Sequence, residues 1–226
     1  MKKERFHIVI FLLGILSGCL RWYLYARGLD ERGLIPGGSL VDLILWVLTA
    51  AALVLCFLSK QPERKADQWT TALGMYILAF GLLFSTRELH QGYRGLLTVV
   101  RALSLLSAII LAVEGTLTFR GKTLSWLWLP VCLTFIVRLV GAYQTWSRDP
   151  QMQDFLLPLL AGLSLAAVAY RRGAERLGLP RSPWTYRFAM AAMYLCLAAS
   201  DGLDSYYVNC GVSALLLSYR QEEPSC

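Results

Sequence analysis

Eight long apolar runs, separated by short polar or charged breaks, constrain this chain more than any other feature of its sequence. A helix needs about 20 apolar residues to cross the hydrocarbon core of a bilayer. Runs of about that length predict membrane-spanning helices at 6–26, 39–59, 70–87, 95–117, 124–145, 154–170, 184–200 and 203–219. We therefore expect an all-α fold: one integral membrane domain over residues 1–226, built as a polytopic transmembrane helix bundle.

The composition favours lipid over water as the solvent of most side chains. Only 16% of the residues are charged and 56% are hydrophobic, whereas roughly 25% are charged in a soluble domain. A net charge of +7 would suggest nucleic acid as the partner of a soluble protein. Here the basic residues lie in short loops, which is typical of membrane proteins facing an anionic leaflet. We expect a lipid bilayer as partner and no nucleic acid.

The placement of Lys and Arg predicts the orientation. With the N-terminus in the cytoplasm, the cytoplasmic loops and ends hold 14 of the 22 Lys and Arg residues, and the outer loops hold five. Cytoplasmic loops of membrane proteins carry such an excess. We therefore expect a cell-membrane protein whose N-terminus, and whose C-terminus if there are eight helices, is cytoplasmic.

The helix count depends on the segment 201–204. A tight turn there gives eight helices, whereas the start of an outer tail gives seven. We favour eight, because the apolar end of the chain would be costly to leave in water.

Short matches between the two halves of the chain suggest a parallel repeat of four helices each, over 1–122 and 123–226. The matching pairs begin at Leu20 and Val137, Trp69 and Trp184, and Met75 and Met193, with offsets of 117, 115 and 118 residues. Parallel repeats occur in transporters, with the substrate between the halves. The alternative is coincidence, since Trp and Tyr favour membrane interfaces in any case.

Three arginines lie within the apolar runs, in the outer third of each, and form the core of the candidate site. Ionisable groups in a membrane are costly and often functional, and the guanidinium fork suits carboxylate and phosphate. We predict an outward-facing pocket for a small anionic solute. Its candidate residues are Arg21, Arg101, Arg138, Asp42, Asp201, Asp204, Tyr25 and Tyr143. The alternative is that each arginine pairs with a carboxylate or extends to the headgroups.

Two further features have mainly structural interpretations. Glu114 lies near the cytoplasmic end of its run, where we expect it to pair with Arg120. The segment Leu16–Cys19 resembles a lipoprotein cleavage site, but the run continues beyond it into an aromatic interface. We expect an intact first helix, with Gly14 and Gly18 packing against a neighbour.

The absence of catalytic motifs limits the function classes. The sequence has no H-E-x-x-H, G-x-S-x-G or Walker sequence. We expect no metal, no cofactor and no catalytic residue, and rank small-solute binding or transport first, with a partner membrane subunit as an option. The alternatives are a regulatory or assembly protein, and an intramembrane lipid-modifying enzyme that would use Asp201 and Asp204.

Overall fold

The computed structural model describes residues 5–27, 40–59, 65–88, 96–122, 128–146, 155–180, 182–200 and 205–221. Within these ranges the chain forms eight α-helices, which confirms the all-helical fold. The helices are α1 (Arg5–Arg27), α2 (Leu40–Leu58), α3 (Gln68–Glu88), α4 (Leu97–Phe119), α5 (Trp128–Trp146), α6 (Leu156–Arg176), α7 (Pro183–Ala199) and α8 (Ser205–Ser218). Two-residue strands, β1 (Lys65–Ala66) and β2 (Arg220–Gln221), pair in parallel.

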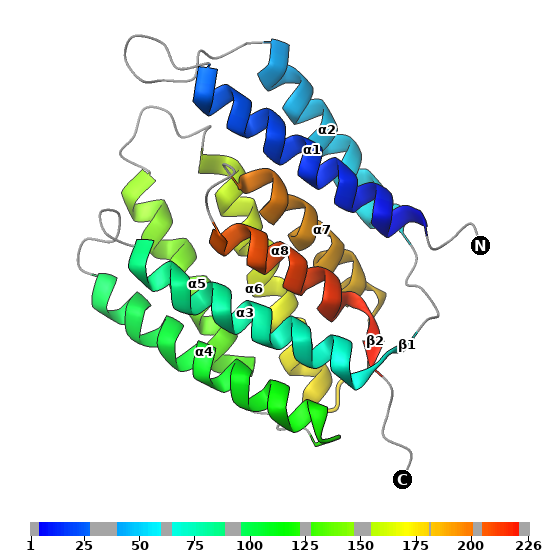
Figure 1. The fold of residues 1–226 in the computed structure, drawn as a ribbon, viewed down its shortest axis with the longest axis vertical. Coiled ribbons are helices and arrows are strands. Elements are labelled where there is room, and N and C mark those ends of the chain that lie inside the picture. Colours follow the sequence, from blue (N-terminus) through cyan, green and yellow to red (C-terminus); the bar gives the residue numbers. More distant parts are fainter. Residues whose placement is uncertain are drawn as a thin grey trace.

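Consecutive helices run in opposite directions, so the helix ends gather at two ends of the bundle (Figure 1). We call one of them the basic end: it holds Ser59, Arg120–Lys122, Leu177–Pro180, Tyr219 and the β1–β2 pair. The other is the opposite end. The pairing of β1 with β2 joins the segment before α3 to the segment after α8, so both lie at the basic end.

Within the described ranges, four helices are long and apolar enough to cross a membrane, which indicates a membrane protein. They lie at Phe6–Ala26, Leu40–Leu58, Gln68–Thr86 and Leu97–Phe119, within α1 to α4. The later helices are shorter or more polar: α8 has only 14 residues, which span about 21 Å, against about 30 Å for the hydrocarbon core. The structure thus supports a helical membrane bundle and, by length and composition, four of its eight predicted spans.

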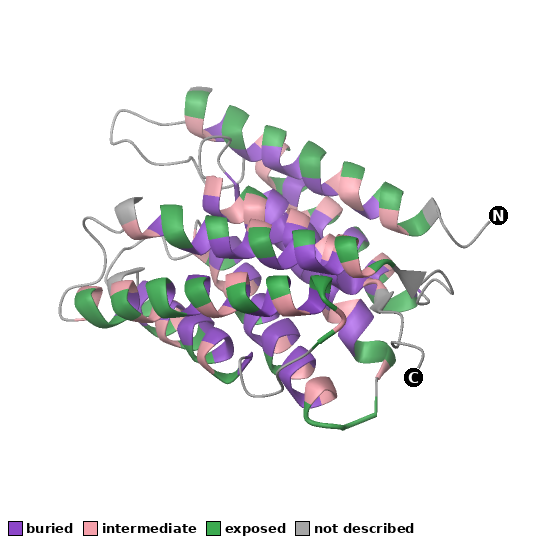
Figure 2. Cartoon of the chain, turned by 60° about the horizontal axis from the view of Figure 1, so that its bottom comes forward, coloured by how far each residue is buried: buried purple, intermediate pink, exposed green. Residues whose placement is uncertain are grey.

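The outer surfaces of the helices are apolar, as lipid contact requires. On α2, Leu40, Leu43 and Val47 are 74%, 62% and 60% exposed. Figure 2 shows exposed residues on the outward sides of the helices and buried residues on the sides that face the bundle. Apolar surface this extensive is unusual on a soluble monomer.

Helix α7 lies at the centre of the bundle and packs on α1, α2, α6 and α8. All its residues from Ala189 to Ala199 are buried. A helix enclosed by protein on all sides does not have to match the thickness of the lipid, which explains how a helix of 17 residues fits here.

The small residues of α1 pack inside the bundle, as expected. A Cβ at Gly18 would lie 2.6 Å from the backbone oxygen of Leu197, and one at Gly14 would lie 3.0 Å from Leu197 Cδ1. The Gly14–Gly18 face therefore brings α1 against α7.

Glycines end α4 and α6 at the basic end in the same way. Gly121 and Gly178 have φ angles of +72° and +93°. The next amide in each case, that of Lys122 or Leu179, donates to a carbonyl five residues earlier, at 2.8 and 3.1 Å. This Schellman geometry favours glycine.

The two halves of the chain do not pack alike. Helix α6 packs on α5 and α7, whereas α2, its counterpart in the repeat, packs on α1 but, among the described residues, not along α3. Tyr194 is 0% exposed, while its counterpart Tyr76 is 40% exposed. The matched positions thus occupy different environments, and the predicted 4+4 repeat gains no support from the packing of the described residues.

Candidate functional site

Polar residues recur along the buried face of α4 over most of its length. Ser104, Ser107, Glu114 and Thr118 are all 0% exposed. Their spacing of three, seven and four residues keeps them on one helix face. Arg101, half-buried and one turn before Ser104, extends the same face towards the opposite end. We call these five residues the α4 polar stripe.

Arg138 of α5 lies at a meeting point of four helices beside the stripe. Its Nη1 donates to Ser85 Oγ of α3 at 2.7 Å and to Ser104 Oγ of α4 at 3.4 Å. Its guanidinium carbon lies 4.1 Å from the ring centroid of Tyr206 of α8, which is a cation–π distance. The arginine is only 9% exposed, so its charge is held in a fixed orientation inside the bundle.

One turn towards the basic end, the stripe contacts α5 again. Ser107 Oγ lies 2.7 Å from Thr134 Oγ1. The Thr134 hydroxyl is close to two carbonyls, those of Pro130 at 2.8 Å and Leu103 at 3.2 Å. Because these carbonyls can only accept, Thr134 donates to them and Ser107 donates to Thr134.

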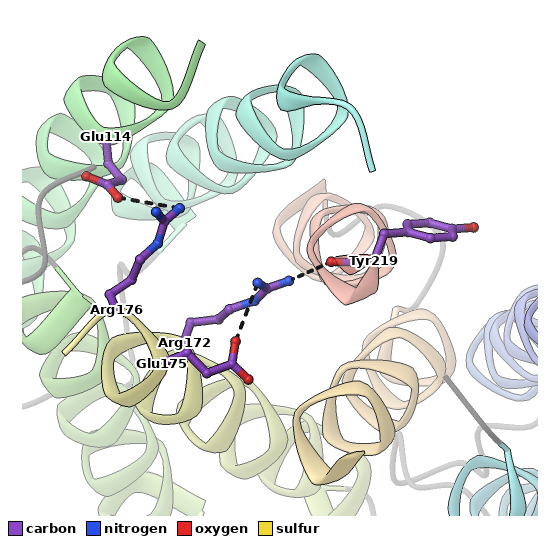
Figure 3. Close-up of polar contacts among 5 residues, drawn as sticks. All are labelled: Glu114, Arg172, Glu175, Arg176 and Tyr219. Atoms are coloured by element: carbon purple, nitrogen blue, oxygen red, sulfur yellow. Dashed lines mark hydrogen bonds and ion pairs between the residues drawn. The ribbon is translucent and has the colours of Figure 1, made fainter. Parts of the chain in front are cut away.

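Charged side chains close the basic end of the stripe (Figure 3). Arg176 of α6 points to Glu114 of α4, with 3.8 Å between Nη2 and Oε1. Arg172, one turn earlier, donates to the backbone oxygen of Tyr219 at 3.3 Å and lies 3.7 Å from Glu175. The predicted Glu114–Arg120 pair is therefore wrong as the main ion pair, because Arg120 is exposed after the helix has ended.

These contacts lie on one boundary of the bundle, which we call the seam. On one side of the seam lie α3, α4 and α8, where α3 packs on the other two. On the other side lie α5 and α6, which pack on each other. Helix α4 also packs on α5, but among the described residues α4 does not pack along α6. Long arginine side chains therefore bridge the helices at both ends of the seam.

The predicted site residues do not all gather in one place. Arg101 and Arg138 both lie at the α4–α5 boundary, since Ser104 contacts Arg138 and follows Arg101 by one turn. Arg21 lies on α1, which packs on α2 and α7. Its Nη2 is 3.4 Å from Tyr25 Oη, and it stands over the Tyr25 ring at 5.6 Å.

The remaining predicted residues lie elsewhere or outside the described ranges. Asp42 is half-buried in the first turn of α2. Tyr143 is 50% exposed, and its position five residues after Arg138 puts it on a different face of α5. Asp201 and Asp204 lie outside the described residues, as does the predicted turn between α7 and α8.

A separate hydroxyl cluster joins α7 to the first two helices. The Tyr194 hydroxyl lies 2.8 Å from Ser17 Oγ of α1 and 3.1 Å from Thr49 Oγ1 of α2. The Thr49 hydroxyl donates to the Leu45 oxygen at 2.8 Å, so Tyr194 donates to Thr49 and Ser17 donates to Tyr194. Each group has a partner inside the protein, which suits a structural role.

An apolar groove lies between α1, α7 and α8. Its volume is about 460 Å³, and it is lined by Phe11, Ile15, Gly18, Cys19, Trp22, Leu197, Ser200, Val208 and Val212. Cys19 is exposed there, whereas Cys56, Cys132, Cys196 and Cys210 are buried as free thiols. Within the described ranges, no group of three or more His, Cys, Asp or Glu side chains could hold a metal ion.

Comparisons with protein-family models, with curated proteins and with solved structures find no match for this chain.

Proposed function

We propose that this chain is a multi-pass membrane protein that binds a small anionic solute at Arg138 and moves it along the seam. The observation that carries this proposal is the α4 polar stripe. The stripe places Arg, Ser, Ser, Glu and Thr in turn along one face of a helix that is long enough to cross a membrane. Charged residues at such depths are costly. Ionisable residues inside a membrane, such as Arg101 and Glu114 here, often mark the path of a solute or ion.

The chemistry of the seam favours an anion of the carboxylate or phosphate class. Arg138, held by two serine hydroxyls and the Tyr206 ring, presents a planar donor with little freedom to move. A preorganised guanidinium binds such anions with little loss of conformational entropy. Ser104 and Ser107 continue the path with hydroxyls that can donate or accept.

In this proposal all eight helices cross the membrane and the basic end faces the cytoplasm. The excess of Lys and Arg in the loops at that end supports this orientation. The short α7 is compatible with it, because its buried position spares it contact with lipid.

Anion-dependent stabilisation of the purified protein tests the binding step. We expect succinate or phosphate, at constant ionic strength, to raise the melting temperature of the wild type in detergent, because ligands of the folded state stabilise it. Arg138→Gln removes this response. Arg21→Gln is the matched control: Arg21 is equally buried, at 6%, but lies on α1 away from the seam, so its response stays.

The groove between α1, α7 and α8 favours a second candidate, a membrane-embedded interaction protein. Its lining would accept an apolar helix of a partner membrane subunit. In that case a stoichiometric subunit copurifies with the wild type, and Val212→Trp, which fills the groove, releases it. Succinate and phosphate then raise the melting temperature of neither the wild type nor Val212→Trp. The intramembrane enzyme stays a third option without support from the described residues, since its acidic pair lies outside them.

A further inference from the structure

The basic end of the seam is closed by side chains where helices do not pack. Among the described residues, α4 does not pack along α6, and α6 makes only slight contact with α8. Two polar contacts bridge these gaps: Glu114 with Arg176, between α4 and α6, and Arg172 with the Tyr219 oxygen, between α6 and the end of α8. Figure 3 shows both arginines reaching outwards from α6 to neighbouring elements.

The geometry of these contacts suits a reversible closure. The Glu114–Arg176 separation of 3.8 Å is an ion pair and lies beyond ordinary hydrogen-bond length. Its members are 0% and 15% exposed in their side chains, so water screens the pair little. Separating a poorly screened pair is costly unless water or another partner reaches the charges. The pair therefore holds α4 to α6 until water enters between the two helices.

The position of the pair on the stripe relates it to the solute path. Glu114 lies seven residues, about 10 Å, from Ser107 towards the basic end. Ala108 and Leu111, 7% and 1% exposed, are the buried apolar residues between them. A solute that has reached Ser107 therefore meets Leu111 and then the Glu114–Arg176 pair before it leaves the bundle.

A buried donor lies next to the same contacts. Trp128, at the start of α5, is 2% exposed, and its indole N–H has no hydrogen-bond partner among the described residues. A Cβ at Gly173 would lie 3.1 Å from the Trp128 Cβ, so this tryptophan packs against Gly173 of α6, the residue after Arg172. Buried donors are normally satisfied, so a water or a passing polar group would find a donor here.

We propose that Glu114–Arg176 and Arg172–Tyr219 form a gate that closes the seam at its basic end. This inference rests on the proposed function, because a gate needs a path to close. The gate opens when α6 moves away from α4 and α8, which breaks both contacts together. The contacts of Arg138 with α3, α4 and α8, at the other end of the seam, stay formed while the gate opens.

Thiol labelling tests the gate. Ser107→Cys is introduced into a chain whose six native cysteines are replaced by serine or alanine. A membrane-impermeant methanethiosulfonate reagent is added from the basic side. We expect slow labelling in this parent and labelling about tenfold faster with Glu114→Gln, the change typical of losing one charge-assisted contact. Arg176→Gln, as a second variant, gives the same increase.

Two further variants make the result specific. Asp67→Asn is the matched control, because it removes an exposed carboxylate at the same end, just before α3, that takes part in neither gate contact. It leaves the labelling rate unchanged. The exchange Glu114→Arg with Arg176→Glu restores the pair with reversed charges and returns labelling to the parent rate.

The outcomes separate the gate from the proposed function. Equal labelling of the parent, Glu114→Gln and Arg176→Gln overturns the gate, as does an equal increase with Asp67→Asn. If the same proteins keep their stabilisation by succinate or phosphate, only the gate is overturned. If the wild type shows no such stabilisation, the proposed function is overturned instead.

Discussion

The guanidinium of Arg138 lies over the ring of Tyr206, 4.1 Å from its centroid, and joins α5 to α8 across the seam. Cation–π contacts of this kind contribute about 0.5–2 kcal/mol, with the larger values where water is excluded. Tyr206 is 7% exposed, so water has little access to this contact.

Removal of the Tyr206 ring tests whether that contact positions Arg138. Tyr206→Leu removes the aromatic face, and we expect it to lower the free energy of unfolding by about 1–2 kcal/mol and to weaken anion-dependent stabilisation. Tyr206→Phe keeps the face and retains most of both. Chemical denaturation in detergent measures the free energy of unfolding. An equal loss of this free energy in Tyr206→Leu and Tyr206→Phe would show that the aromatic ring does not position Arg138.

The hydroxyl of Tyr194 gives a prediction for the first two helices. Tyr194→Phe breaks the contacts with Ser17 and Thr49, and polar contacts between membrane helices contribute about 0.6 kcal/mol each, up to about 1.7. We expect a loss of about 1–2 kcal/mol in the free energy of unfolding.

The control for that change is Tyr76→Phe. The Tyr76 hydroxyl contacts Thr116 at a similar 2.8 Å, but on an exposed surface of the bundle. We expect a smaller loss, and a loss as large as that of Tyr194→Phe would contradict a special role for the buried cluster.

The close approach of α1 to α7 predicts a large effect from one methyl group. Gly18→Ala places a Cβ 2.6 Å from the Leu197 oxygen, so α1 must move away from α7. We expect a loss of about 1–3 kcal/mol, the range typical of overpacking, measured by thermal unfolding. Gly162→Ala is the control, because its Cβ meets only Leu139 Cδ1, at 3.2 Å, which can move. Similar melting temperatures for the two variants would rule out the close contact.

The strand pairing gives a prediction about topology. Because β2 follows α8 and pairs with β1 before α3, the segments at 65–66 and 220–221 lie at the same end of the bundle. In the proposed orientation this end faces the cytoplasm. We expect reporters fused after residue 221 and inserted between α2 and α3 to indicate the cytoplasm in both cases. Reporters on opposite sides would contradict the eight-helix arrangement.

The sequence predicted the helices well because apolar length is a local property. The predicted ranges differ from α1 and α2 by one residue at each end. The exception is α6, predicted to end at 170 but extending to Arg176. Arg171 and Arg172 indicated a cytoplasmic loop, but Arg172 is buried at 6% and bonded to Tyr219, a contact that no local pattern reveals.

The site was predictable only in part, because its contacts join residues that are far apart in the sequence. Arg138 stood out because a charge in an apolar run is rare, but its partners Ser85 and Ser104 are common residues in membrane helices. The spacing of Ser104, Ser107 and Glu114 after Arg101 was the available signal for the stripe. Arg176 could not be assigned to Glu114 in advance, because the pair depends on how α4 and α6 are placed.

Measuring solute flux tests directly whether this protein moves an anion across the membrane by way of Arg138. The wild type, Arg138→Gln and Arg21→Gln are reconstituted into liposomes, and uptake of radiolabelled succinate and phosphate is measured. We expect uptake of at least one of the two anions by the wild type and by Arg21→Gln, and uptake at the level of empty liposomes by Arg138→Gln. Uptake by Arg138→Gln equal to that of the wild type, or no uptake of either anion by the wild type, would contradict this proposal.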